Sequence, residues 1–89
     1  MAGSIIGGEI PALQHLQVSL QQQSVTVDDL LAALTGEVDS TWWQGGAADR
    51  FRSAWEADYK PALRRLSEAL VDASNEVRNR GDMLIQVGS

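Results

Sequence analysis

The sequence predicts an all-α protein: an antiparallel helix-turn-helix hairpin that dimerises into a four-helix bundle. Three observations lead to this prediction. Apolar residues recur at helical spacing through both halves of the chain, a glycine pair interrupts the pattern near the midpoint, and there is no cysteine to stabilise a smaller fold. A chain of 89 residues has room for a single domain, which we place at residues 1–89.

The first helix is expected over about residues 9–40, after a glycine-rich, flexible segment at residues 1–8. Pro11 suits the first helical turn, where its missing N–H costs little. A short strand at residues 24–27 is an alternative for the β-branched middle, but a seven-residue spacing continues across it. That spacing defines one side of an amphipathic helix, formed by Leu13, Leu20, Val27 and Leu34.

The turn is expected at residues 41–46. Glycine reaches positive φ without steric cost, so Gly45 and Gly46 are a natural point of reversal. A helix restarts at about residue 47, and Asp49 places a negative charge at the positive end of its dipole. The chain is therefore expected to run back along its first helix.

The second helix is expected over about residues 47–85, followed by a tail at residues 86–89. Gly81 is a candidate C-terminal cap, and continuation of the helix to about Ile85 is the alternative. The apolar residues first recur every four positions and then alternate steps of four and three. They are Phe51, Trp55, Tyr59, Leu63, Leu66, Leu70, Ala73, Val77 and Leu84.

The change of spacing between Trp55 and Tyr59 is a stutter, which is expected to unwind any supercoil locally. Pro61 follows it and has no N–H to donate. We therefore predict a bend here, with the carbonyl of Ala57 unpaired.

Charge is unevenly distributed along the chain. The net charge is −5, and residues 1–46 contain no Lys or Arg. The sequence therefore has no basic stripe for nucleic acid. The second helix carries charges spaced by four, which are expected to form a solvated outer face: Arg52, Glu56, Lys60, Arg64 and Glu68.

Several functional classes find no support in the residues. No apolar run approaches the length of a membrane span, and the N-terminus lacks the charged region of a cleavable signal peptide. One histidine and no cysteine provide no metal-ligand set. We find no nucleophile with a base at suitable spacing and no phosphate-binding loop. The sequence therefore predicts no catalytic residue, no cofactor and no enzymatic activity.

The apolar positions are wider than one helix–helix contact, which predicts a partner. Each of two long rods can bury only the strip that touches the other, and a large exposed apolar patch is unusual in a monomer. Two hairpins packed face to face would cover this surplus. Spacing leaves open which residues pack within the hairpin and which between chains. Those expected to carry dimerisation are Leu13, Leu20, Val27, Leu34, Phe51, Trp55, Leu63, Leu66, Leu70 and Val77.

The turn also carries a motif, Trp43-Gln44-Gly45, followed by small residues and then by Phe51. In a short chain between two long helices, this resembles the Trp-x-Gly turn of the WXG-hundred family, the ESAT-like small proteins of type VII secretion. The resemblance covers nearly the whole chain. It implies a helical hairpin that forms a homodimer, or a heterodimer with a related WXG-type protein. It also implies recognition by the type VII secretion machinery and secretion without a cleavable signal peptide, from the cytoplasm.

The resemblance implies a role for Trp43 in export recognition, with Gly45 supplying the turn. The alternative is purely structural, with Trp42 and Trp43 closing the end of the bundle.

The family's C-terminal export motif, a tyrosine followed four residues later by Asp or Glu, is not matched. Alignment through Gly81 places its two positions at Leu84 and Gly88. A partner then carries the signal, or the tail is truncated, or the protein is an intracellular adaptor that masks the helical head of a larger type VII effector. A further alternative is a plain coiled-coil module with an accidental Trp-x-Gly.

Overall fold

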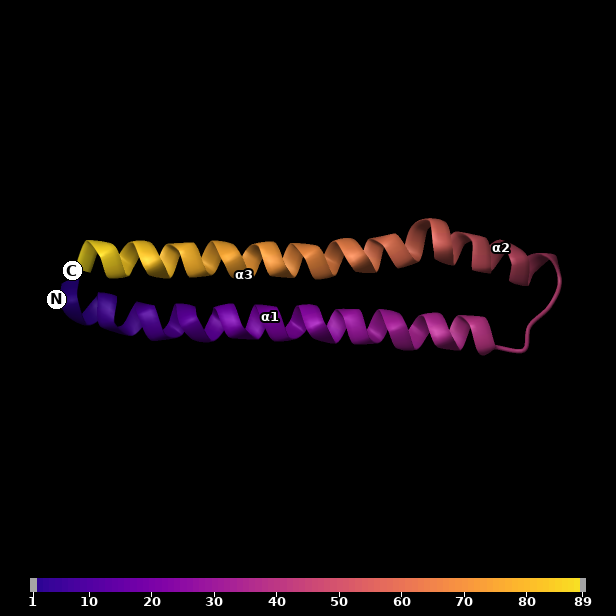
Figure 1. The fold of residues 1–89 in the computed structure, drawn as a ribbon, viewed down its shortest axis with the longest axis horizontal. Helices are drawn as coiled ribbons and strands as arrows, with labels where there is room; N and C mark the ends of the chain where they lie inside the picture. Colours follow the sequence, from indigo (N-terminus) through magenta and orange to yellow (C-terminus); the bar gives the residue numbers. More distant parts are fainter. Residues whose placement is uncertain (1, 89) are drawn as a thin grey trace.

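The structure is a computed structural model that describes the backbone of residues 2–88 and the side chains of residues 8–87. Two helical rods lie antiparallel, joined by one loop, and both ends of the chain lie at the opposite end from this loop (Figure 1). The described residues contain no strand, so the predicted all-α hairpin is confirmed. The helical segments are α1 (Ala2–Ser40), α2 (Gly46–Ala54), the π-helix η1 (Trp55–Tyr59) and α3 (Lys60–Gly88).

The hairpin is a narrow rod. Its principal extents are 66 × 17 × 15 Å and its radius of gyration is 19.8 Å. A compact domain of the same length has a radius of gyration of about 12 Å. The two rods therefore form a two-helix ribbon with most side chains near solvent.

The first rod begins earlier than expected, and the second rod ends later than expected. α1 begins at Ala2, not at about residue 9, and Met1 lies outside the described residues. Pro11 therefore lies inside the helix and not in its first turn. A proline removes one backbone hydrogen bond, but the residues before it can still be helical. α3 continues through Gly81 to Gly88, so the helix passes the candidate cap.

The loop reverses at Gly45, whose φ of 106° and ψ of 179° lie in a region essentially restricted to glycine. The carbonyl of Gly45 accepts the N–H of Asp49 at 3.0 Å, which starts α2. Asp49 lies in the first turn, as predicted. Ala48 beside it is completely buried and anchors this end of the hairpin.

The change in spacing between Trp55 and Tyr59 coincides with η1. The N–H of Lys60 donates to the carbonyl of Trp55, five residues earlier, which widens the turn by one residue. Pro61 follows and lacks an N–H. α2 precedes this turn and α3 follows it, and the axes of these two helices are inclined to each other (Figure 1). The unpaired carbonyl of Ala57 stays a prediction.

The contact between α1 and α3 contains a row of small residues on α3, seven positions apart: Ser67, Ser74 and Gly81. Ser67 is 7% exposed and Ser74 is completely buried. The Ser67 hydroxyl donates to the carbonyl of Ser24, and that of Ser74 to the carbonyl of Gln17, each at 3.3 Å. These two bonds set the antiparallel register. We call Ser67, Ser74 and Gly81 the small-residue row.

Candidate protein-interaction face

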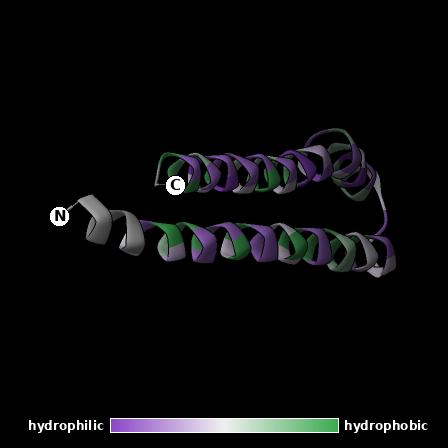
Figure 2. Ribbon diagram, turned by 60° about the vertical axis from the view of Figure 1, so that its left-hand side comes forward, coloured by the Kyte–Doolittle hydropathy of each residue, from purple (hydrophilic) through white to green (hydrophobic). Residues whose placement is uncertain are grey.

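We call the contact between α1 and α3 the seam. Beside the small-residue row, the seam contains a second row of residues that is apolar and only half-buried. Its members recur every seven residues on both helices, as predicted for α1. We call it the leucine row, and it consists of Leu13, Leu20, Val27 and Leu34 on α1 and Leu63, Leu70, Val77 and Leu84 on α3. Figure 2 shows the hydrophobic stretches recurring along both rods.

Members of the leucine row line grooves between the two rods. Leu13 of α1 lines one groove with Met83 and Leu84 of α3, and Leu34 lines another with Phe51 of α2. A single partner surface can therefore reach apolar side chains from both rods.

Further apolar residues flank the leucine row. Leu16, Leu30 and Leu66 each follow a member of the row by three positions, and they are 45%, 48% and 47% exposed. We define the apolar face as the leucine row together with its flank of Leu16, Leu30, Leu66, Ala62, Ala69 and Ala73.

The middle of the apolar face carries no charge. As defined, the face holds only Leu and Val on α1 and only Leu, Val and Ala on α3, and the charged residues of the same stretches, such as Asp28, Asp29 and Glu68, are not part of it. Charged residues are depleted at the centres of protein–protein interfaces. This composition is typical of a surface that another protein covers.

At the loop end the apolar face becomes aromatic. The rings of Trp43 and Phe51 lie 5.8 Å apart, and those of Phe51 and Tyr59 lie 6.3 Å apart. Trp55 is 7% exposed, and its buried indole N–H has no partner. An apolar groove runs along this end, and we call it the aromatic groove. It is lined by Phe51, Trp55, Tyr59, Ala62 and Leu63.

At the opposite end lies a second apolar groove, which we call the terminal groove. Met83 and Val87 in it are 59% and 78% exposed. Arg80 brings the only charge to it among the described residues and pairs with Glu76 at 3.7 Å. The groove is lined by Leu13, Arg80, Met83, Leu84 and Val87.

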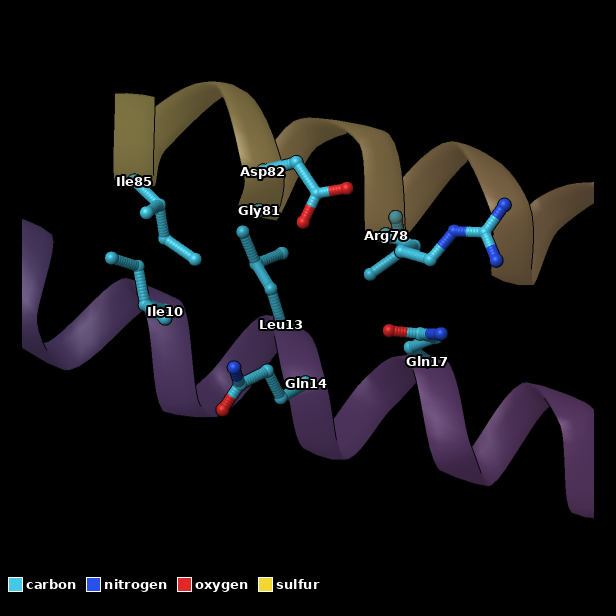
Figure 3. A pocket seen from close by; sticks show the side chains of 9 residues that line it. Ile10, Leu13, Gln14, Gln17, Arg78, Gly81, Asp82 and Ile85 are labelled. Carbon is cyan, nitrogen blue, oxygen red and sulfur yellow. The ribbon is translucent and has the colours of Figure 1, made fainter. Parts of the chain in front are cut away.

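The reverse side of the seam carries polar groups and a small cavity of about 50 Å³ beside Gly81. Leu13 extends towards Gly81, while Gln14, Arg78 and Asp82 lie around the opening (Figure 3). A Cβ at Gly81 would meet nothing within 4 Å. Ile10 and Ile85 line the same cavity, and Ile85 is 47% exposed, so this side of the hairpin mixes polar and apolar side chains.

Arg52 holds the loop. Its guanidinium donates to the carbonyls of Thr41 and Trp43, each at 2.9 Å, and to that of Val38 at 3.4 Å. The carbonyls at the end of α1 lack helical partners, and a cation also suits the negative end of the helix dipole. Arg52 was expected on the solvated outer face, and this expectation was wrong because the nearby carbonyls bind it.

The two tryptophans of the turn differ in exposure. Trp42 is 87% exposed, whereas Trp43 is 42% exposed and packs against Phe51. The motif drew attention to Trp43 and Gly45 as the recognition residues. The structure places Trp43 in the groove that Leu34 and Phe51 line, and it leaves Trp42 as the more accessible side chain.

The ten predicted dimerisation residues occupy three environments. Trp55 is buried, and Phe51 and Leu66 are exposed at 40% and 47%. The other seven belong to the leucine row and are half-buried: Leu13, Leu20, Val27, Leu34, Leu63, Leu70 and Val77. All of these side chains therefore lie on the apolar face or in the aromatic groove.

Two ion pairs join residues four apart on the second rod. Glu56 pairs with Lys60 at 3.2 Å, and Glu76 with Arg80 at 3.7 Å. Exposed pairs of this kind contribute roughly 0.2–1 kcal/mol each. They make the outer surface polar but do not determine the fold.

Within the described residues, no helix combines the length and apolar character needed to cross a bilayer. No group of three or more His, Asp or Glu side chains in this part of the chain lies close enough to hold a metal ion. The chain matches no protein-family model, no curated protein and no solved structure.

Proposed function

We propose that this protein acts by binding another helical hairpin through its apolar face, as a substrate of type VII secretion or as one member of a co-secreted pair. The observation that carries the proposal is the apolar face itself, because its centre is free of charge and half-exposed. The grooves at its two ends extend this surface over the length of the rod.

The surface area supports a partner. The chain exposes 6303 Å², whereas a compact monomer of 9.6 kDa exposes about 5,100 Å². Among the described residues, only Ala48 and Trp55 are buried apolar side chains. A hairpin with so small a core gains its hydrophobic stabilisation by covering the apolar face with a second hairpin.

The turn supports the secretion part of the proposal. Trp43-Gln44-Gly45 resembles the Trp-x-Gly turn at its position between two antiparallel rods, and Gly45 has the backbone conformation that demands glycine. In this proposal Trp43 contributes to recognition by the secretion machinery, and Gly45 fixes its direction.

A second candidate function is an intracellular adaptor that covers the helical head of a larger type VII effector. The residues after Gly81 favour it, because Leu84 and Gly88 occupy the two positions at which alignment through that glycine places the export motif. Such an adaptor uses the same apolar face, but it remains in the cell.

Export can be tested with the tagged chain in a secretion-competent strain and in a strain whose type VII machinery is disabled. Appearance in the culture supernatant of the first strain alone supports a secreted protein. Retention in the cell pellet of both, with an effector co-purifying, favours the adaptor.

The role of the turn is tested in the same strains with Trp43→Arg, and Trp42→Arg is the matched control. Loss of export of a still-folded Trp43→Arg protein supports recognition through Trp43. Normal export of that variant would remove the turn from the proposal.

A further inference from the structure

We propose that the hairpin contains a binding site for one buried water molecule, between Thr35 of α1 and Trp55 of η1. Among the described residues, two buried side-chain polar atoms have no hydrogen-bond partner: Thr35 Oγ1 and Trp55 Nε1. The water accepts the indole N–H of Trp55 and the hydroxyl of Thr35. The inference is independent of the proposed function, because it concerns the interior of a single hairpin.

The hydrogen bonds of the loop end place these two residues at one level of the hairpin. The Arg52 guanidinium donates to the carbonyl of Val38, so residues 52 and 38 lie opposite each other. Trp55 lies three residues further along the second rod, and Thr35 lies three residues back along α1. Because the rods are antiparallel, these two steps end at the same level.

The serine bonds give the same level from the other direction. Ser67 lies opposite Ser24, since its hydroxyl donates to the Ser24 carbonyl. Thr35 is eleven residues after Ser24, and Trp55 is twelve residues before Ser67. The difference of one residue is the residue that the π-helix η1 adds to its turn. Both routes therefore place the two unpartnered atoms in one layer.

The hydroxyl of Thr35 behaves differently from those of the other threonines. Thr26 and Thr41 each donate to the carbonyl four residues earlier, which is the ordinary local bond of a threonine on a helix. For Thr35 this acceptor would be the carbonyl of Leu31, but the buried Oγ1 of Thr35 makes no hydrogen bond. The side-chain conformation of Thr35 therefore leaves its hydroxyl available to another group.

The carbonyl of Leu31 provides the third partner of the water. At seven-residue intervals, carbonyls of α1 accept a hydrogen bond from a side chain of the second rod, namely those of Gln17, Ser24 and Val38. Leu31 is the member of this series between Ser24 and Val38, one turn before Thr35. A carbonyl oxygen has two lone pairs, so it can accept a water proton in addition to its helical bond. Three hydrogen bonds are typical of a buried water.

The water would also fix one wall of the aromatic groove, which Trp55 lines. Buried polar groups are nearly always hydrogen-bonded, because an unpaired group loses its bonds to solvent on folding. A water bonded to the indole N–H satisfies this group and restricts the orientation of the ring. The site therefore connects the interior of the hairpin to the surface at the loop end.

A high-resolution crystal structure of the wild-type chain tests the site directly. We expect one ordered water at hydrogen-bonding distance, about 2.7–3.2 Å, from both Thr35 Oγ1 and Trp55 Nε1. A direct bond between these two atoms would overturn the proposal. A Thr35 hydroxyl turned to the Leu31 carbonyl, or no ordered water in this layer, would overturn it as well.

The sign of a stability change provides a second test. Thr35→Val removes the hydroxyl with little change of shape and takes one partner from the water. The unfolding equilibrium constant in urea should rise roughly 5- to 100-fold, measured at one fixed protein concentration. Thr26→Val is the matched control on the exposed surface of the same helix and should stay within about twofold of the wild type. If the Thr35 hydroxyl is unpaired, Thr35→Val should instead stabilise the protein, which would overturn the proposal.

Nuclear magnetic resonance of the indole N–H groups reports on the bridge itself. The chain has three tryptophans, so Trp42→Phe and Trp43→Phe assign two indole signals and leave the third to Trp55. In Thr35→Val the Trp55 indole proton should move upfield, because its hydrogen bond to the water is weakened or lost. In Thr26→Val it should stay in place. A Trp55 signal that is the same in Thr35→Val and in the wild type would contradict the water bridge.

Discussion

Substitution of the two neighbouring glycines of the loop by alanine should have opposite effects on stability. Gly45 has a φ of 106°, and a Cβ there would meet nothing within 4 Å, so the cost of Gly45→Ala is entirely backbone strain. A residue forced into this region costs about 1–3 kcal/mol. In a domain of this size each kcal/mol lowers the melting temperature by about 4–8 °C.

Gly46→Ala is the matched control. Gly46 is the first residue of α2, and a Cβ there would approach only the end of the Arg50 side chain, at 3.3 Å, which can move. Replacing a helical glycine by alanine stabilises a protein by about 0.4–1 kcal/mol. Thermal unfolding followed by circular dichroism, at one fixed protein concentration, measures both variants. Equal shifts for the two would refute the assignment of strain to Gly45.

Further substitutions test the other parts of the structure. Arg52→Gln removes the clamp on three loop carbonyls and should destabilise the fold by about 1–3 kcal/mol in urea unfolding, whereas Arg65→Gln on the exposed surface should change little. Ser74→Leu overfills the completely buried contact with α1 and should cost about 1–3 kcal/mol; unchanged stability would contradict the register. Gly81→Ala should stabilise α3 by about 0.4–1 kcal/mol, since its Cβ has free space; a loss of stability would contradict this reasoning. Leu66→Asp should dissociate the proposed assembly and lower the melting temperature, because Leu66 is 47% exposed within one hairpin; an assembly unchanged in light scattering would exclude the flank from the interface.

The fold was predictable because its strongest signals are local. The seven-residue recurrence from Leu13 to Leu34 defines the leucine row of α1, and the turn is marked by a glycine that the observed φ requires. The change of spacing before Pro61 falls at the residues of η1, but a π-helix could not be deduced from spacing.

The small-residue row, which forms the other half of the seam, could not be predicted from hydropathy. Ser67 and Ser74 are among the most buried side chains described, yet serine on a helix normally indicates an outer face. Leu66 was assigned to the apolar stripe beside them, and it lies on the exposed flank. A buried serine is recognisable only once the opposite backbone carbonyl is located.

The contacts of the loop could not be predicted from the sequence pattern either. Arg52 fits a four-residue charge pattern that is typical of a solvated face, but three carbonyls bind it. The motif selects Trp43 over its neighbour Trp42, but only the fold shows that Trp42 is 87% exposed and that Trp43 packs on Phe51. Contacts between residues distant in sequence determine both results.

Sedimentation equilibrium of the purified wild-type chain, combined with thermal unfolding over a range of concentrations, tests most directly whether this hairpin needs a second one. We expect a mass of twice 9.6 kDa at micromolar concentration and a melting temperature that rises with concentration. A folded species of 9.6 kDa with a melting temperature independent of concentration would show that the hairpin is stable alone and would contradict the argument that a second hairpin stabilises it.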